Sequence, residues 1–206
     1  MTTVRFSIVE PFTPLPLERV REPFDDPAFV FENKWDGFRA LAFVTNTGAT
    51  LVSRNGNPFR RFAPLATGLR SVLGARDAVI DGEVVCLDGD GRPQFRELLF
   101  SRAAPSFVAF DLLALNGRDL RRLPLLERKR MLRRVIPKRR DTVLYSDHVT
   151  GRGRDLFAVI AGNDLEGIVA KLAAAPYALI NGRSPFIKIK HAHYTQARDR
   201  HELFAR

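Results

Sequence analysis

A short charged stretch around residues 32–39 combines residue types that could do chemistry. Lys34, Asp36 and Arg39 stand beside Gly37, between two apolar runs typical of β-strands. If the chain is extended here, Glu32, Lys34 and Asp36 project from one face, because alternate side chains of a strand point the same way. An exposed strand face with a ladder of charges has the same pattern. This stretch alone does not separate a reactive site from a solvated face.

Further charged residues fall inside runs that predict strands buried on one face. They are Asp81-Gly82-Glu83, Glu166-Gly167 leading to Lys171, and Lys188 and Lys190 in alternation with isoleucines. Singly, each has a structural explanation, either a turn at a strand end or the polar face of an edge strand. Jointly they are harder to explain in that way, because these segments and the stretch around Lys34 hold four of the six lysines among 33 basic residues.

The scarcity of lysine suggests a reason for each one, since arginine fills the general surface role in this chain. A lysine amine, with an ordinary pKa of about 10.4, acts as a nucleophile when positive charge, a metal or burial keeps it partly neutral. The set therefore indicates attack of a lysine on a nucleotide phosphate, with other lysines neutralising the developing charge. Glu83 and Glu166 suit magnesium. Phe110 is interpreted either as a platform for a base or as a core phenylalanine.

The elements that must position these residues follow from periodicity and turn residues. Residues 29–34, 39–45 and 50–54 predict an antiparallel meander, and the five prolines before residue 28 predict an irregular lead-in. Further strands are predicted at 78–88, 106–114, 143–149, 167–172 and 185–190, and helices at 58–73, 95–100, 125–136 and 153–161. The pattern is α+β and rich in antiparallel strands, without a regular βαβ alternation or a phosphate-binding glycine loop.

Composition narrows the class of protein. A net charge of +10 favours a polyanionic partner such as nucleic acid. The single cysteine, Cys86, excludes an intramolecular disulfide, and its apolar neighbours predict a buried thiol. No signal-peptide pattern and no membrane-length apolar run is present, so we expect a cytoplasmic protein with no membrane partner. The arginine bias indicates a bacterial source.

Six stretches in order resemble the motifs of the covalent nucleotidyltransferases, in particular the ATP-dependent DNA ligases. They are KWDGFR at 34–39, SRNG at 53–56, DGE at 81–83, FDLL at 110–113, EGIVAK at 166–171 and FIKIK at 186–190. The resemblance implies an ATP-grasp-like nucleotidyltransferase adenylation domain over residues 29–190. It follows the lead-in at 1–28 and precedes a short tail at 191–206 that lacks the OB-fold domain of family ligases.

The resemblance also implies a role for each matching residue. Lys34 would be the catalytic lysine that forms lysyl-AMP, and Asp36 would assist it. The residues implied to bind ATP are Glu32, Arg39, Arg54, Glu83, Phe110, Lys171, Lys188 and Lys190, with Glu83 and Glu166 serving Mg²⁺ or Mn²⁺. Glu32 would read the adenine amino group. AMP would then pass to the 5′-phosphate of nicked duplex DNA during repair or recombination.

Two departures from the family pattern stand out. Phe186 replaces the usual tryptophan, which should keep the packing. The short tail cannot form a barrel, so we expect an OB-fold domain or repair protein to act in trans, and His191, His193 and His201 to be solvated. The alternatives are an RNA ligase or capping-type nucleotidyltransferase, and a non-catalytic nucleic-acid-binding module.

Overall fold

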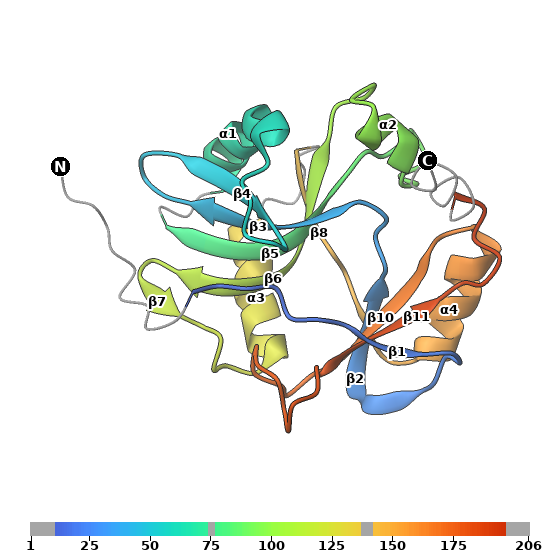
Figure 1. Cartoon of the computed structure of the whole chain (residues 1–206). Helices are drawn as coiled ribbons and strands as arrows, with labels where there is room; N and C mark the ends of the chain where they lie inside the picture. The colour runs from blue at the N-terminus through green and yellow to red at the C-terminus, as the bar shows by residue number, and fades with distance from the viewer. Residues whose placement is uncertain (1–10, 74–76, 137–141, 197–206) are drawn as a thin grey trace.

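The computed structural model describes residues 11–73, 77–136 and 142–196, and in this part of the chain two twisted sheets lie against each other (Figure 1). The five-stranded sheet has the order β1-β11-β10-β2-β9, with only the β1–β11 pair parallel. Its strands are β1 (Glu18–Val20), β2 (Asp26–Asn33), β9 (Val149–Gly151), β10 (Gly167–Leu172) and β11 (Phe186–Lys190).

The six-stranded sheet has the order β4-β3-β5-β6-β7, and β8 pairs with β6 in parallel. Its strands are β3 (Phe38–Val44), β4 (Ala49–Ser53), β5 (Ala78–Val85), β6 (Ser106–Leu115), β7 (Arg118–Asp119) and β8 (Val143–Tyr145). The predicted α+β class, rich in antiparallel strands, is confirmed.

Helices cover the outer faces of both sheets. The helices are α1 (Ala63–Val72, after the 3₁₀ turn Arg60–Phe62), α2 (Phe95–Leu99), α3 (Leu125–Val135) and α4 (Gly153–Gly162). Helices α1 and α3 share one apolar core with the six-stranded sheet, whereas α4 packs on the five-stranded sheet. None of the described helices is long and apolar enough to cross a membrane.

A second apolar core lies between the two sheets. Val30 and Val169 contribute to it from the five-stranded sheet, and Leu41 and Leu113 contribute from the six-stranded sheet. Alternate side chains of β2 point to opposite faces of the sheet, so Phe31, next to Val30, faces α4 instead. Glu32, one residue further, therefore projects back between the sheets, which is where the candidate site lies.

Three sequence-based predictions about the strands were wrong. Strand β2 does not form a meander with β3, because residues 34–37 cross from one sheet to the other instead of making a hairpin turn. The predicted strand at 143–149 is two short strands, β8 and β9, in different sheets. The lead-in, predicted to be irregular, contains the edge strand β1, which pairs with β11. An edge position tolerates prolines near the strand.

Gly37 makes the crossover between the sheets possible. A Cβ atom at this position would lie 2.1 Å from the carbonyl oxygen of Val84 on β5. Any larger residue would push the 34–37 segment away from the six-stranded sheet. The crossover places Lys34 at the seam between the sheets, with its backbone N–H bonded to the carbonyl of Gly167 at 2.9 Å.

Candidate active site

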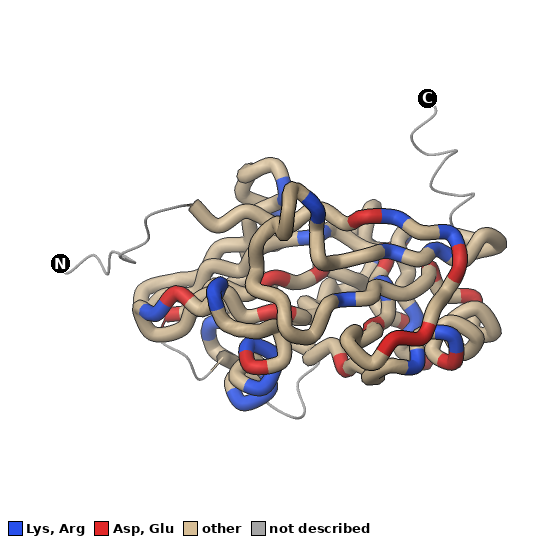
Figure 2. The backbone as a smooth tube through the Cα atoms, turned by 90° about the horizontal axis from the view of Figure 1, so that it is seen from below, with Lys and Arg blue, Asp and Glu red and all other residues tan. Residues whose placement is uncertain are grey.

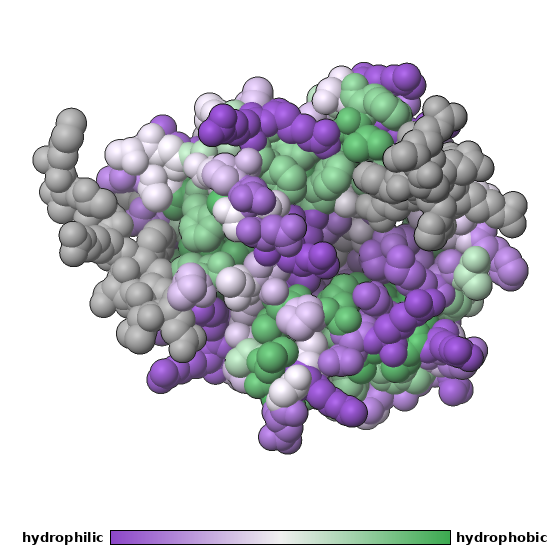
Figure 3. Space-filling model, in the orientation of Figure 1, coloured by the Kyte–Doolittle hydropathy of each residue, from purple (hydrophilic) through white to green (hydrophobic). Residues whose placement is uncertain are grey.

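A narrow inner pocket and a wider groove lie between the sheets and share part of their walls. The groove has a volume of about 460 Å³, which is within the range of roughly 300–1,000 Å³ typical of small-molecule sites. Hydrophilic side chains lie along the middle of this face (Figure 3). The inner pocket is lined by Leu17, Glu32, Lys34, Trp35, Arg39, Glu83, Phe110, Val169, Lys171 and Phe186. The groove adds Arg54, Glu166, Lys188 and Lys190, among others.

Lys34 stands where the pocket meets the groove. Its Nζ lies 2.5 Å from Oε2 of Glu166, whose Oε1 is 2.9 Å from Nζ of Lys190. Burial raises the pKa of Glu166, but the two ammonium groups outweigh burial and the pKa is lowered overall. Glu166 is thus an ionised carboxylate that holds Lys34 beside the groove.

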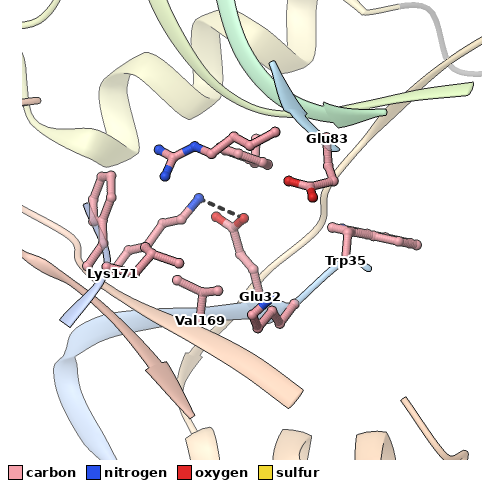
Figure 4. A pocket seen from close by; sticks show the side chains of 10 residues that line it. Glu32, Trp35, Glu83, Val169 and Lys171 are labelled. Atoms are coloured by element: carbon pink, nitrogen blue, oxygen red, sulfur yellow. Dashed lines mark hydrogen bonds and ion pairs between the residues drawn. The ribbon is translucent and has the colours of Figure 1, made fainter. Parts of the chain in front are cut away.

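Glu32 projects from β2 into the inner pocket, where Figure 4 shows its carboxylate bonded to Lys171. Nζ of Lys171 donates to Oε2 at 2.9 Å, and Nζ of Lys129 lies 2.8 Å from Oε1. Burial opposes ionisation of Glu32, yet the two lysines lower its pKa. The pocket therefore contains a buried carboxylate that accepts hydrogen bonds and does not donate them.

Phe110 supplies a flat apolar wall opposite these charges. Nζ of Lys171 lies 4.2 Å from its ring centroid, and the guanidinium carbon of Arg39 lies 5.6 Å from it. Cations over an aromatic face are attracted to its quadrupole. A ring beside a buried acceptor is suited to a planar ligand that carries N–H donors.

A buried carboxylate holds Arg39 in the wall of the inner pocket. It makes a two-pronged interaction with Asp81, at 3.1 and 2.7 Å, and donates to the carbonyl of Leu15 at 2.6 Å. Tyr177 donates its hydroxyl to the same carboxylate at 2.6 Å. Although burial opposes the charge, Asp81 raises the pKa of Arg39 further above its ordinary value. Arg39 is thus a permanent, rigidly oriented cation in the pocket wall.

Glu83 has the opposite electrostatic character. Burial raises its pKa to about 8, with Lys34 and Arg39 opposing the shift and Glu166 and Asp81 adding to it. Glu83 and Glu166 both line the groove. Among the described residues no three His, Cys, Asp or Glu side chains form a metal cluster. Two carboxylates nevertheless fit Mg²⁺, which takes one or two of them together with phosphate and water.

The remaining predicted site residues lie in different places. Arg54, Lys188 and Lys190 line the open groove, and burial and the neighbouring cations lower the pKa of Lys188. Asp36 lines neither the pocket nor the groove. It is buried and accepts a 3.0 Å hydrogen bond from the hydroxyl of Tyr194. His193 is exposed and His191 partly so, and His201 lies outside the described residues.

Comparison with known proteins shows the family of the chain. Residues 10–190 match the family model described as ATP dependent DNA ligase domain. The chain belongs to this family. The sequence-based recognition is thereby confirmed, and the predicted buried state of Cys86 is confirmed by the structure.

Bacterial members of the family are similar in sequence. The chain is 32% identical to DNA ligase C1 of Mycolicibacterium smegmatis over 191 residues, covering 84% of this chain and 54% of that protein. It is 31% identical over 166 residues to the multifunctional non-homologous end joining DNA repair protein LigD of Mycobacterium tuberculosis, covering 79% of this chain and 22% of that protein. The chain thus spans about half, or less, of these relatives.

Solved structures of the family share the fold. A mycobacterial DNA ligase D complexed with ATP and MES superposes with a TM-score of 0.70 at 27% identity, covering 87% of this chain and 60% of that chain. The ATP-dependent DNA ligase from bacteriophage T7 has a TM-score of 0.53 at 16% identity, covering 85% of this chain and 68% of that chain, which shows the common fold alone.

The structure also reveals site residues that were not predicted from the motifs. Lys129 reaches Glu32 from α3, and Tyr177 and Tyr194 hold Asp81 and Asp36. One signal was present for Lys129, since it is one of few lysines in an arginine-rich chain. Neither tyrosine had a signal, because the bonds span 96 and 158 positions of sequence.

Proposed function

We propose that this chain is the adenylation domain of an ATP-dependent DNA ligase and that Lys34 carries the nucleotide. Nζ of Lys34 attacks the α-phosphate of ATP, a phosphorus–nitrogen bond forms, and pyrophosphate leaves. The attacking amine must be neutral, and Oε2 of Glu166 at 2.5 Å is the nearest acceptor for its proton. That contact, at the junction of the pocket and the groove, is the observation that supports the proposal most.

The adenine ring is placed in the inner pocket. There its face stacks on Phe110 and its 6-amino group donates to Glu32, whose carboxylate favours a donor over the 6-oxo group of guanine. The phosphates lie in the groove, where Lys188 and Lys190 neutralise charge as it develops, and Lys171 adds its charge from the inner pocket. Mg²⁺ or Mn²⁺ held by Glu83 and Glu166 would add Lewis-acid assistance.

We also propose that AMP passes from Lys34 to the 5′-phosphate of nicked duplex DNA. The basic groove residues, with Arg39 and Arg54, suit a polyanionic substrate. A 3′-hydroxyl then displaces AMP and seals the nick. We expect this last step to need an OB-fold domain, which can be supplied as a separate protein.

Intact-protein mass spectrometry tests the first step. The protein is incubated with ATP and magnesium beside Lys34→Arg, which keeps the charge next to Glu166 but removes the nucleophile. A gain of roughly 329 Da, absent in the variant, is expected for a lysyl-AMP adduct. No adduct in the presence of an added OB-fold domain would refute the adenylation function and favour a binding module. Sealing of nicked DNA and of nicked RNA then separates the two ligase classes.

A further inference from the structure

Lys129 is a fully buried lysine on α3, behind Glu32 and not itself among the residues that line the inner pocket. Its side chain is 1% exposed. Its Nζ donates to the carbonyl oxygens of Ser146 at 3.0 Å and Phe110 at 3.4 Å, and lies 2.8 Å from Oε1 of Glu32. Burying an ammonium group is costly unless such partners repay the lost hydration. Of these partners, Glu32 and Phe110 line the inner pocket, and Ser146 follows the end of β8.

The adjacent residue of α3 is also a buried cation, but its partners lie outside the pocket. Arg128 is also fully buried, but it forms an ion pair with Asp111 and donates to the carbonyls of Leu123 and Ala175. Arg128 therefore ties the helix to the core. Lys129 instead contacts Glu32, the pocket carboxylate proposed to accept from the adenine amino group.

The two oxygens of Glu32 contact different lysines. Oε2 receives an aligned hydrogen bond from Lys171. Oε1 lies 2.8 Å from Nζ of Lys129, whose charge and hydrogen bond both lower the pKa of Glu32, and this oxygen is buried. The two lysines thus hold both oxygens, so the carboxylate cannot rotate or take up a proton without losing one of these contacts. Each carboxylate oxygen has a further lone pair for an N–H donor, and Figure 4 shows the carboxylate facing the other residues of the pocket.

We propose that Lys129 is a positioning residue that holds Glu32 as an obligate acceptor and thereby sets the preference for a 6-aminopurine nucleotide over a 6-oxopurine nucleotide. This inference rests on the proposed adenylation function. With Lys129 in place, the carboxylate stays ionised and keeps the orientation in which Oε1 contacts Lys129 and Oε2 contacts Lys171. Without Lys129, a protonated or rotated Glu32 would donate to a 6-oxo group as readily as it accepts from a 6-amino group.

The test compares adenylation by ATP and by inosine triphosphate, which has a 6-oxo group in place of the amine. For Lys129→Met we expect the ratio of kcat/KM for ATP to kcat/KM for inosine triphosphate to fall by about tenfold or more. The loss should lie mainly in KM for ATP. In the double variant with Glu32→Gln the ratio should fall no further than in Glu32→Gln alone, because Lys129 acts through Glu32.

Arg133→Met is the matched control. Arg133 lies one turn further along α3, and its guanidinium carbon is 4.8 Å from the Tyr145 ring, over which Nζ of Lys129 also lies at 4.7 Å. It has no ion pair with Glu32. We expect this control to keep the wild-type ratio. If Lys129→Met slows both nucleotides equally, or if its effect adds fully to that of Glu32→Gln, the positioning role is wrong and Lys129 is structural.

A second measurement leaves Lys129 unchanged, in case its replacement prevents folding. The ¹³Cδ resonance of Glu32, assigned by its loss in Glu32→Gln, should keep the chemical shift of a carboxylate from pH 8 down to pH 5. A protonated Glu32 at pH 6 would overturn the inference. Absence of any adduct with wild-type protein and ATP would instead refute the proposed function on which the inference rests, so the two failures are distinguishable.

Discussion

The hydroxyl of Tyr194 donates a 3.0 Å hydrogen bond to Oδ2 of Asp36, joining the segment after β11 to the crossover that holds Lys34. Tyr194 is 3% exposed, and Asp36 is 2% exposed. The next residue, Thr195, bonds to Asp164 through both its backbone N–H and its hydroxyl. Gln196 is bonded in turn to Pro93 and Phe95. Of these attachments only the one from Tyr194 touches the crossover.

Replacing Tyr194 with phenylalanine removes only the donor to Asp36. Loss of a buried hydrogen bond to a carboxylate should lower the free energy of unfolding by about 1.5 kcal/mol and slow the labelling of Lys34 by ATP. Urea denaturation and the rate of adduct formation measure the two effects. Thr195→Val is the control, because it weakens the second attachment alone. Equal slowing in both variants would show that Asp36 has no special part.

The buried pair of Arg39 and Asp81 should contribute far more to stability than an exposed ion pair does. Asp81 is fully buried and Arg39 only 15% exposed, so Asp81→Asn leaves a desolvated guanidinium without its counterion. We expect a loss of about 3 kcal/mol in the free energy of unfolding. The control is Asp155→Asn in the pair with Arg152, whose side chains are 62% and 73% exposed. That change should cost less than about 1 kcal/mol. Similar losses in the two variants would contradict the prediction.

The raised pKa of Glu83 predicts a pH-dependent penalty on stability. Its pKa is about 8 in the folded protein against an ordinary value of 4.5, so the folded state binds this proton more tightly than the unfolded state. The contribution of Glu83 is therefore most favourable below pH 4.5 and is lost as the pH rises to about 8. Glu83→Gln does not titrate and should escape this loss.

The measurement is the difference in Tm between Glu83→Gln and the wild type, in a chelator and without nucleotide. The Tm of the variant should exceed that of the wild type at pH 8.5, and the difference should shrink towards pH 5. Other titrating groups cancel in this comparison. A Tm difference that stays constant over this range would show that Glu83 ionises in the folded state near its ordinary pKa.

Gly167 allows the start of β10 to pack closely against β11, next to Lys34. Its φ is +141°, and a Cβ atom there would lie 2.1 Å from the carbonyl oxygen of Ile189. Gly167→Ala should therefore cost about 2 kcal/mol or more and should also reduce adduct formation, since the carbonyl of Gly167 holds the backbone of Lys34. Gly162→Ala, where no atom lies within 4 Å of the added Cβ, should be neutral or stabilising. Thermal denaturation of the two variants distinguishes them.

The local sequence determined much of the fold and pointed to the residues of the candidate site. The strands at 38–44, 78–85 and 106–115 and all four described α-helices were predicted, because each has a clear apolar period and turn residues at its ends. The motif residues around Lys34, Glu83, Glu166 and Lys188 were recognisable because reactive groups must occur as fixed residue types at fixed spacing. The roles assigned to them remain predictions.

Only the tertiary structure decided which strands pair and which charges meet. The run from 29 to 45 predicts a hairpin by its local pattern, but burial of Phe31 under α4 and of Leu41 between the sheets assigns β2 and β3 to different sheets. Lys129 meets Glu32, and Tyr194 meets Asp36, across long stretches of chain. Periodicity records which face of an element is buried. The partner on that face depends on how the elements pack, which no local pattern contains.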